Sequence, residues 1–380
     1  MNSPRICRVE MGTLIATRPR SAGSNARIGV HGDRIRVPIA RLTLDDGTTG
    51  FGRCLASQTQ AEALLGQPLD ALFTPESGTA EAWRVWDVPL WDLAGVRAGE
   101  PAYALAARMN GKSAPSVPFR VRCYDTSLYF DDIHLTDETE AVALIAGEAH
   151  EGYARGHRAF KIKVGRGGRW MPTEAGTLRD IAIVRAVRAA IGPGLPIMLD
   201  ANNGYTLNVT KRVLAETADC GVFWMEEPFH EDPRLYECLK EWLAAENLPV
   251  LIADGEGDAS THLMEWAHEG LIDVVQYDVF AHGFSQWLAT GRTLDGWGRR
   301  SAPHHYGAMY GNYVTGHLAG AVAGFAFAEW DEATAPGLDA SAYHLDEGWI
   351  TIPQTPGFGL ALDEEHFQQA VTQSGFVLSD

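Results

Sequence analysis

The chain has 380 residues, of which 46% are hydrophobic and 21% are charged, and it carries a formal net charge of −18 at pH 7. This length is too great for one ordinary hydrophobic core, so we expect either two domains or one large barrel with an added domain. The acidic balance argues against a nucleic-acid surface, and no apolar stretch approaches the roughly 18 residues that a membrane span needs.

The first third of the chain has the pattern of an α+β domain. Residues 36–44 alternate between polar and apolar side chains, and a turn of two aspartates and a glycine separates them from a second strand over 48–54. Apolar residues then recur at helical spacing over 81–97 and again over 103–109. Strands followed by helices in this order do not form parallel β/α units.

The start of the chain and its cysteines indicate the compartment. The first residues, MNSPRICRVE, lack the apolar core of a secretory signal peptide. The five cysteines are odd in number and scattered, and none of them forms a CxxC pair. We therefore expect a cytoplasmic protein whose cysteines are buried thiols rather than disulfides or zinc ligands.

From about residue 120 the pattern changes to short apolar segments that alternate with amphipathic helical segments. Eight apolar segments occur: VRCY, FKIKV, PIMLDAN, GVFWMEEP, PVLIADGE, DVVQYDV, RSAPHHYG and GFAFAEWD. Eight β/α units over roughly 230 residues predict an α/β fold of the (β/α)8 TIM-barrel type. A doubly wound open sheet is the rival fold, but no GxGxxG follows any of these strands.

The end of the chain completes the predicted division into domains. Its tail contains the Pro- and Gly-rich stretch PQTPGFGLALD, which does not continue the β/α alternation. We expect this tail to return to the first domain. The predicted domains are therefore an α+β domain over 1–120, a barrel over 121–352, and a returning tail over 353–380.

Ionisable side chains gather at the carboxyl ends of the predicted strands. Seven successive strands end on such residues or carry them: Lys161 and Lys163, Asp200, Glu226 and Glu227, Asp254 and Glu256, Asp278, His304 and His305, and Glu329. A single charge at a strand end is commonly a solvated loop residue, but the strand ends of a barrel converge on one mouth. Seven strands in succession therefore indicate an active site.

The residue types predict the chemistry of this mouth. Three carboxylates from neighbouring strands cannot share a cleft without a cation, and Mg²⁺ is the natural choice for oxygen ligands. Lys163 would face His304 across the mouth, with its pKa lowered by the metal and by Lys161. Asp278 could fix the tautomer of the His304 ring. A base on each face of a metal-bound acid suits removal of the proton α to a carboxylate through an enediolate.

The motifs KIK, LDAN, EEP, DGE, QYD, APHH and FAEWD, in this order, resemble those of the enolase superfamily, and more narrowly its mandelate racemase subgroup. The segment PLWDLAGVRAGEP, which precedes the barrel, also resembles the signature of that family. The resemblance covers nearly the whole chain. It implies a modified barrel that binds Mg²⁺ and an N-terminal α+β capping domain that closes over the barrel.

The resemblance implies that Asp200, Glu226 and one acid from the fifth strand are the metal ligands. The family usually shows a plain Gly-Glu pair at this third position, whereas this chain has Asp254-Gly-Glu256. Alternation along a strand places both acids on the same face. We favour Glu256, because the Gly-Glu pair matches, and keep Asp254 as the alternative third ligand.

The resemblance also implies the catalytic residues. Lys163 matches the base of the KxK motif, and His304 with Asp278 matches a His–Asp dyad. Glu329 matches the acid that hydrogen-bonds an oxygen of the substrate carboxylate. Lys161 is expected to tune Lys163 or to bind a carboxylate.

Further residues are candidates for substrate binding. Asn202 matches a family position near the substrate, and His230 follows the fourth strand closely enough either to touch the substrate or to cap a loop. Arg18, Arg20 and Arg27 lie where the family's substrate-covering loop would be. They could bind a second carboxylate or hydroxyl groups, or they could be solvated.

The sixth strand distinguishes branches of the family. A lysine there would indicate the muconate-lactonising or dipeptide-epimerising branch, but this chain has Gln276 and Asp278. The resemblance therefore implies a hydro-lyase that removes water from an aldonic or aldaric sugar acid to give a 2-keto-3-deoxy acid. Racemisation or epimerisation of a 2-hydroxy acid is the first alternative, and a non-catalytic barrel that binds a metal and an acid sugar is the second. We expect a homo-oligomer with no nucleic-acid or membrane partner.

Overall fold

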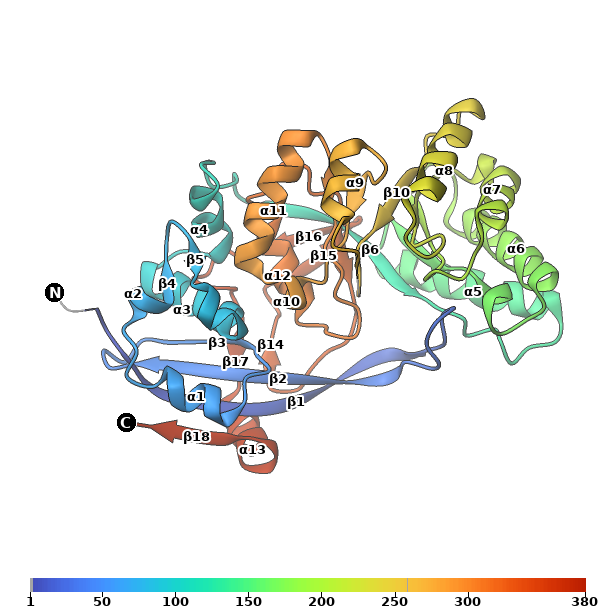
Figure 1. The fold of residues 1–380 in the computed structure, drawn as a ribbon. Helices are drawn as coiled ribbons and strands as arrows, with labels where there is room; N and C mark the ends of the chain where they lie inside the picture. The colour runs from blue at the N-terminus through green and yellow to red at the C-terminus, as the bar shows by residue number, and fades with distance from the viewer. Residues whose placement is uncertain (1–2, 258) are drawn as a thin grey trace.

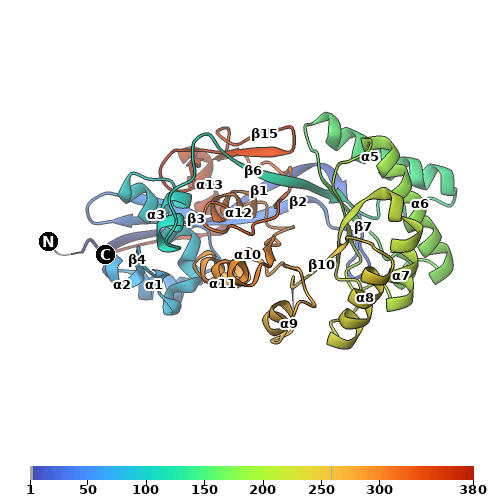
Figure 2. The ribbon, with the colours of Figure 1, turned by 90° about the horizontal axis from the view of Figure 1, so that it is seen from above.

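A computed structural model describes residues 3–257 and 259–380, and it contains a capping domain and a β/α barrel (Figure 1). The long ribbon formed by β1 and β2 runs beneath the barrel, from the end of the molecule that holds both termini as far as α5 (Figures 1 and 2). Within the described residues, no helix combines the length and the apolar character that crossing a membrane would need.

The capping domain is built on an antiparallel sheet whose order is β18-β1-β2-β3. Its strands are β1 (Ile6–Ala22), β2 (Gly32–Leu44), β3 (Thr49–Arg53) and β18 (Phe376–Ser379). Its first helices and short strands are α1 (Gln58–Leu64), α2 (Leu69–Leu72), β4 (Phe73–Thr74), β5 (Gly78–Thr79), the 3₁₀ helix η1 (Glu81–Trp86), α3 (Asp87–Ala98) and α4 (Ala102–Met109). Because β18 pairs with β1, the tail returns to the first domain as the sequence predicts.

Among the described residues the barrel contains eight parallel strands, which confirms the predicted fold class. They are β6 (Phe119–Leu128), β7 (Phe160–Lys163), β8 (Ile197–Asp200), β9 (Val222–Glu226), β10 (Leu251–Asp254), β11 (Val274–Val275), β12 (Arg300–Ser301) and β13 (Ala328–Trp330). Successive strands pair in chain order, and β13 pairs back onto β6. A bridge between Ser301 and Phe325 closes the remaining gap.

Helices surround the barrel strands in chain order. They are α5 (Glu138–Ala154), α6 (Thr173–Ile191), α7 (Leu207–Glu216), α8 (Pro233–Ala245), α9 (Leu263–Glu269), α10 (Val279–His282), α11 (Phe284–Trp297) and α12 (Gly311–Leu318), with the short 3₁₀ turns η2 (Arg166–Gly168) and η3 (Ala218–Cys220). Strands covered on both faces read as continuous apolar runs. Accordingly, all residues of β7 and β8 are buried, including the charged ones.

The barrel departs from a regular (β/α)8 pattern at its eighth unit. Within the described residues, β13 is followed by the short strands β14 (Leu338–Asp339), β15 (His344–Asp346), β16 (Trp349–Ile352) and β17 (Ala361–Leu362) rather than by a barrel helix. The next helix, α13 (Glu364–Ser374), packs on β1 of the capping domain. The exact domain boundaries near residues 120 and 352 stay a prediction. All five cysteines are free thiols, as expected, but the expectation that they are buried is wrong for Cys238, which is exposed, and for Cys7, which is half-buried.

Candidate active site

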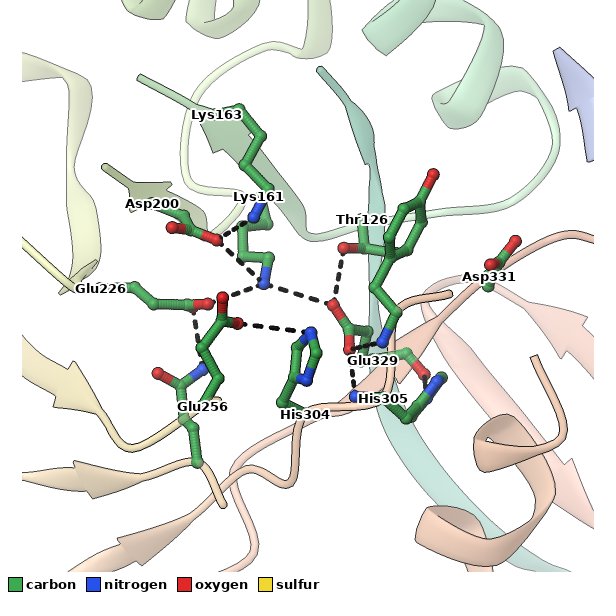
Figure 3. A network of polar contacts seen from close by, with 12 residues as sticks. Thr126, Lys161, Lys163, Asp200, Glu226, Glu256, His304, His305, Glu329 and Asp331 are labelled. Carbon is green, nitrogen blue, oxygen red and sulfur yellow. Dashed lines mark hydrogen bonds and ion pairs between the residues drawn. The ribbon is translucent and has the colours of Figure 1, made fainter. Parts of the chain in front are cut away.

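Three carboxylates meet at the mouth of the barrel. Asp200 ends β8, Glu226 ends β9, and Glu256 follows β10, and one oxygen from each lies within 4.8 Å of the others (Figure 3). The Oε2 atom of Glu256 is buried and has no hydrogen-bond partner within the described residues. An all-oxygen trio with a buried oxygen that accepts no hydrogen bond suits a hard divalent cation such as Mg²⁺.

The register of the parallel strands explains why these residues meet. Lys163 pairs with Asp200 across β7 and β8, and Asp200 pairs with Glu226 across β8 and β9. Glu226 pairs in turn with Ala253 on β10, so Glu256 lies just beyond the same level. The ends of four strands therefore share one layer. Asn202 (φ 41°) and Glu227 (φ 39°) hold left-handed backbone conformations just after β8 and β9, as residues of functional sites often do.

The trio cannot remain fully ionised by itself. Burial and the neighbouring Asp200 raise the pKa of Glu226 to about 8. Burial also acts to raise the pKa of Asp200, but Lys163 and Lys161 outweigh it and hold that pKa below its usual range. A bound cation would allow all three carboxylates to stay charged at neutral pH.

The structure separates the two candidates for the third ligand. Asp254 is buried, accepts a hydrogen bond of 2.5 Å from the Tyr236 hydroxyl and another of 2.7 Å from the Gly255 backbone. It therefore points away from the trio, and burial raises its pKa to about 8. Glu256 is the member of the trio, which agrees with the choice made from the Gly-Glu pair.

Two buried lysines neutralise part of this acidic layer. Lys163 Nζ bonds Asp200, and it lies 5.2 Å from the centre of the Tyr129 ring. Lys161 Nζ lies 2.8 Å from Glu226 and 3.3 Å from both Asp200 and Glu329. Burial lowers the pKa of Lys163, but Asp200 outweighs it and raises that pKa. The lowered Lys163 pKa predicted from the sequence requires the bound metal as well as Lys161, so it stays a prediction.

His304 lies beside the trio on the side opposite Lys163 (Figure 3). Its Nε2 is 3.4 Å from Glu256 Oε2, and its Nδ1 is 3.4 Å from Asp278 Oδ2. The other oxygen of Asp278 caps α10 by accepting from the backbone of Phe280. Burial lowers the pKa of His304, but Glu256, Glu329 and Asp278 together raise it to about 9. The predicted His304–Asp278 pair is present in the structure, and its catalytic role stays a prediction.

Glu329 is held as an acceptor rather than as a donor. Its Oε1 accepts 2.7 Å from Thr126 Oγ1, and its Oε2 accepts from the backbone N–H groups of His305 (2.7 Å) and Tyr306 (2.9 Å). Burial acts to raise the pKa of Glu329, but Lys161 and the nearby histidines hold that pKa well below its usual range. To donate a hydrogen bond to a substrate carboxylate, Glu329 would have to be protonated. The structure gives no support to this predicted role, which stays a prediction.

Asn202 joins the trio to its surroundings. Its Nδ2 donates 2.9 Å to Glu227 and 2.9 Å to Glu256, while its Oδ1 is buried without a partner. Arg27 approaches Glu227 at 3.6 Å. His230 is exposed in the loop after β9. The structure thus brings Asn202 into the site, whereas substrate contact by His230 stays a prediction without support from the geometry.

Arg18 and Arg20, two of the three arginines that the sequence offers as substrate ligands, contact acids of the protein. Arg18 is buried and binds Asp331 at 2.8 Å, and its guanidinium lies 4.3 Å from the Tyr306 ring centre. Arg20 lies 3.2 Å from Glu148 and donates to Ser127. Both side chains thus join the capping ribbon to the barrel, and direct substrate binding by them stays a prediction.

Sequence reasoning missed several residues that support the acids. Trp224 Nε1 and Gln276 Nε2 donate to Glu226 Oε2 at 3.0 and 2.8 Å. Thr126 supports Glu329 from β6. Trp224 stands two residues before Glu226, hence on the same face of the strand, which is a signal that the sequence did offer. No comparable signal identifies Thr126, because it depends on the closure of the barrel.

Comparisons with known proteins agree with this geometry. Residues 144–366 match the family model for enolase C-terminal domain-like proteins. A crystal structure of galacturonate dehydratase from Geobacillus sp., complexed with D-galacturonate and 5-keto-4-deoxy-D-galacturonate, is 48% identical with a TM-score of 0.94 and covers 99% of each chain. A mandelate racemase/muconate lactonizing protein from Geobacillus sp. Y412MC10, complexed with magnesium/tartrate, is 48% identical with a TM-score of 0.96 and covers 100% of this chain and 98% of the other.

A curated relative extends the similarity to another sugar-acid enzyme. D-galactarolactone cycloisomerase of Agrobacterium fabrum is 28% identical over 88% of this chain and 90% of its own length. The family match covers more than half of the chain, and the structural matches cover nearly all of it. This chain belongs to the enolase superfamily, in its mandelate racemase/muconate lactonizing subgroup.

Proposed function

We propose that this chain is a Mg²⁺-dependent hydro-lyase that removes water from a hexuronic acid, with D-galacturonate as the first substrate to test. The observation that carries the proposal is the Asp200–Glu226–Glu256 trio flanked by Lys163 and His304. The substrate follows from the 48% identical dehydratase, whose complex contains D-galacturonate and a keto-deoxy acid. The sequence alone predicts an aldonic or aldaric acid as the substrate. The proposal keeps a sugar acid as the substrate but takes a uronic acid in place of these two classes.

The reaction breaks two bonds next to the carboxylate. In galacturonate the carboxylate carbon is C6, so the α-proton lies on C5 and the β-hydroxyl on C4. Loss of the C5 proton and of the C4 hydroxyl as water gives an enol. Its tautomerisation gives the 5-keto-4-deoxy acid, which is a 2-keto-3-deoxy acid when counted from the carboxylate end.

The side chains divide these proton transfers between two sides of the trio. In this scheme Lys163, on the Asp200 side, takes the C5 proton, and His304, on the Glu256 side, protonates the leaving hydroxyl. Asp278 orients the His304 ring. Lys161, whose ammonium lies among three acids, supplies a fixed positive charge for the substrate carboxylate.

The metal supplies the remaining electrostatic stabilisation. When bound by Asp200, Glu226 and Glu256, Mg²⁺ would stabilise the negative charge that develops on the substrate carboxylate as the C5 proton leaves. Trp224 and Gln276 hold Glu226 in position by donating to its second oxygen. Asn202 holds Glu256 in position by donating to its Oε1.

The experiment is NMR of D-galacturonate incubated with the Mg²⁺-loaded protein in D2O. We expect a keto-deoxy acid that carries deuterium at C4, and no product with Lys163→Ala. Inversion at C5 with retention of the C4 hydroxyl would instead establish epimerisation. No change in the signal of the proton α to the carboxylate, across galacturonate and a library of aldonic and aldaric acids, would contradict the proposal and favour a binding protein.

Two further expectations concern the protein in its cell. We propose that it acts on a small carboxylate substrate in the cytoplasm, and that it forms a homo-oligomer. Sedimentation velocity tests the second expectation, since a single species at the monomer mass of 41.4 kDa would contradict it.

A further inference from the structure

An aromatic cluster, which we call the aromatic wall, lies where the capping ribbon meets the barrel mouth. It consists of His31 from the loop before β2, Tyr129 from the end of β6, and Tyr306 from the loop after β12. The rings of Tyr129 and Tyr306 stack with centroids 4.8 Å apart. The His31 ring meets them edge-on, at 4.7 Å from Tyr129 and 5.8 Å from Tyr306.

The aromatic wall lies next to the ionisable residues of the barrel mouth at two points. Lys163 Nζ lies 5.2 Å from the centre of the Tyr129 ring. The backbone N–H of Tyr306 donates 2.9 Å to Glu329. A sugar acid whose carboxylate lies among the trio and the lysines would therefore extend its other end toward these rings.

Polar atoms of the wall are arranged for hydroxyl groups. The Tyr306 hydroxyl is buried and has no hydrogen-bond partner within residues 3–257 and 259–380. The Nδ1 of His31 lies 2.9 Å from the Gly23 carbonyl oxygen, to which it can only donate. In the neutral ring Nε2 is then an acceptor. Burial lowers the pKa of His31, so the neutral ring is favoured.

The ribbon holds His31 in place through backbone contacts. The His31 backbone N–H donates to the carbonyl oxygens of Ala22 and Gly23. The same loop is bridged to the barrel by Ser24 and Phe130, the residue that follows Tyr129. The histidine position therefore depends on the barrel strand that supplies its neighbouring ring.

Three arginines of the capping ribbon and its loop, Arg18, Arg20 and Arg27, are paired with acids. Arg18 binds Asp331 at 2.8 Å, and Arg20 lies 3.2 Å from Glu148. Arg27 lies 3.6 Å from Glu227. The Arg18 guanidinium lies 4.3 Å from the centre of the Tyr306 ring, but its charge is already balanced by Asp331. A carboxylate placed against the wall would thus meet two phenol rings, an imidazole and a paired guanidinium, and it would lose its hydration without gaining a counter-ion of its own.

We propose that His31, Tyr129 and Tyr306 bind the end of the sugar remote from the reacting carboxylate, and that they select a monocarboxylate over a dicarboxylate of the same configuration. This inference rests on the proposed function, because it takes a sugar acid as the substrate. It identifies the substrate class as uronic or aldonic acids and excludes aldaric acids, which the sequence alone leaves open.

Galacturonate and galactarate are a matched pair for the test, because they differ only in the oxidation state of C1. Binding of each to Mg²⁺-loaded protein is measured by calorimetry in a Lys163→Ala background, which is expected not to turn them over. We expect galacturonate to bind about 100-fold more tightly or better, since the second carboxylate of galactarate would be desolvated without a partner. Equal binding, or tighter binding of galactarate, would overturn the inference.

Variants of the wall sharpen the result. His31→Arg adds a cation and should shift the affinity ratio toward galactarate by about tenfold or more. Its matched control is His344→Arg on the exposed strand β15, which should leave the ratio unchanged. Tyr306→Phe keeps the ring and should weaken galacturonate binding about fivefold, while Tyr153→Phe on α5 should not. An unchanged ratio in His31→Arg and unchanged affinity in Tyr306→Phe would overturn the inference.

Failure of the proposed function gives a different pattern. If the unmutated protein dehydrates neither acid, the proposed function fails, yet the affinity ratio in the Lys163→Ala background still decides whether the wall discriminates. If the protein dehydrates both acids equally well, the hydro-lyase proposal stands and the selective wall is wrong.

Discussion

Two buried acidic clusters lie close together in the barrel, and they differ in how their charge is balanced. In the first, Arg166 binds Asp132 at 2.6 Å and Asp180 at 2.7 Å, and all three side chains are fully buried. The second is the Asp200–Glu226–Glu256 trio with its two lysines. The first cluster is held by a planar guanidinium whose donors match two carboxylates.

The two clusters differ in whether hydrogen bonds from the protein use all of their carboxylate oxygens. Asp180 also accepts from the Gly165 backbone and from the Tyr205 hydroxyl, so its oxygens are fully used. In the trio, Glu256 Oε2 is buried and accepts no hydrogen bond within the described residues, and its ion-pair contact is the His304 ring, whose Nε2 lies 3.4 Å away. A complete buried ion cluster stabilises the fold, whereas an incomplete one indicates a place for a ligand.

The largest expected effect is on turnover. Lys163→Ala and His304→Asn should each lower kcat about 10³- to 10⁴-fold, because each removes one proton-transfer group while the trio remains. Steady-state kinetics measures this, with Lys211→Ala on α7 as the control for loss of a lysine. Normal turnover in either variant would mean that the residues flanking the trio do not move protons.

The Arg166 cluster should instead respond through stability. Arg166→Met leaves Asp180 without its cation and leaves Asp132 with only the Arg179 guanidinium at 3.4 Å, so it should cost about 3–5 kcal/mol of unfolding free energy. Arg185→Met, which removes an exposed ion pair with Asp219, should cost less than about 1 kcal/mol. Denaturant unfolding measures both. If the two variants lost similar free energy, the first cluster would not be the stabilising one.

Metal affinity distinguishes the trio from its neighbours. Glu256→Gln should weaken Mg²⁺ binding at least about 10- to 100-fold, since it replaces a charged ligand oxygen. Asp254→Asn, two residues earlier but hydrogen-bonded to Tyr236, should change the affinity much less. Calorimetric Mg²⁺ titration compares them, and a larger loss in Asp254→Asn would reverse the assignment of the third ligand.

The smallest predicted effect concerns His317, a buried histidine whose two ring nitrogens both have partners while the ring is neutral. The Nδ1 of His317 accepts from the Tyr103 backbone at 3.1 Å, and its Nε2 contacts the Tyr343 hydroxyl at 3.0 Å. Burial lowers the pKa of His317 to about 3. Between pH 6.5 and about 3 the unfolded chain therefore binds one more proton than the folded chain, and stability is lost as the pH falls.

This loss of stability with falling pH can be measured as the slope of the unfolding free energy against pH. His317→Gln should remove about 1.4 kcal/mol per pH unit from the pH dependence of the unfolding free energy between pH 4 and 6. Urea unfolding at several pH values measures the slope, with exposed His344→Gln as the control. An unchanged slope would mean that the folded protein protonates His317 readily.

The sequence predicts the catalytic layer well, because parallel strands place their last residues at one level. Asp200 and Glu226 pair directly across β8 and β9, and Lys163 pairs with Asp200, so a position at a strand end is enough to bring these groups together. The choice of Glu256 over Asp254 rests on a short motif rather than on periodicity, and the trio confirms it.

The rest of the site depends on contacts between distant segments. The sequence gives no sign that Arg18 would pair with Asp331, because that pair joins the capping ribbon to the last barrel strand. Nor does any motif connect His31 with Tyr129 and Tyr306, which come from three separate segments. Such groups meet only after the capping domain and the barrel have packed together.

The measurement that tests the central claim most directly is the metal dependence of dehydration. The protein is stripped of metal, and the conversion of D-galacturonate to a keto-deoxy acid is followed before and after Mg²⁺ is added. We predict no turnover in the stripped protein and full recovery with Mg²⁺, with no recovery in Glu256→Gln at the same Mg²⁺ concentration. Full turnover after rigorous metal removal would contradict the claim that the trio needs a cation to act.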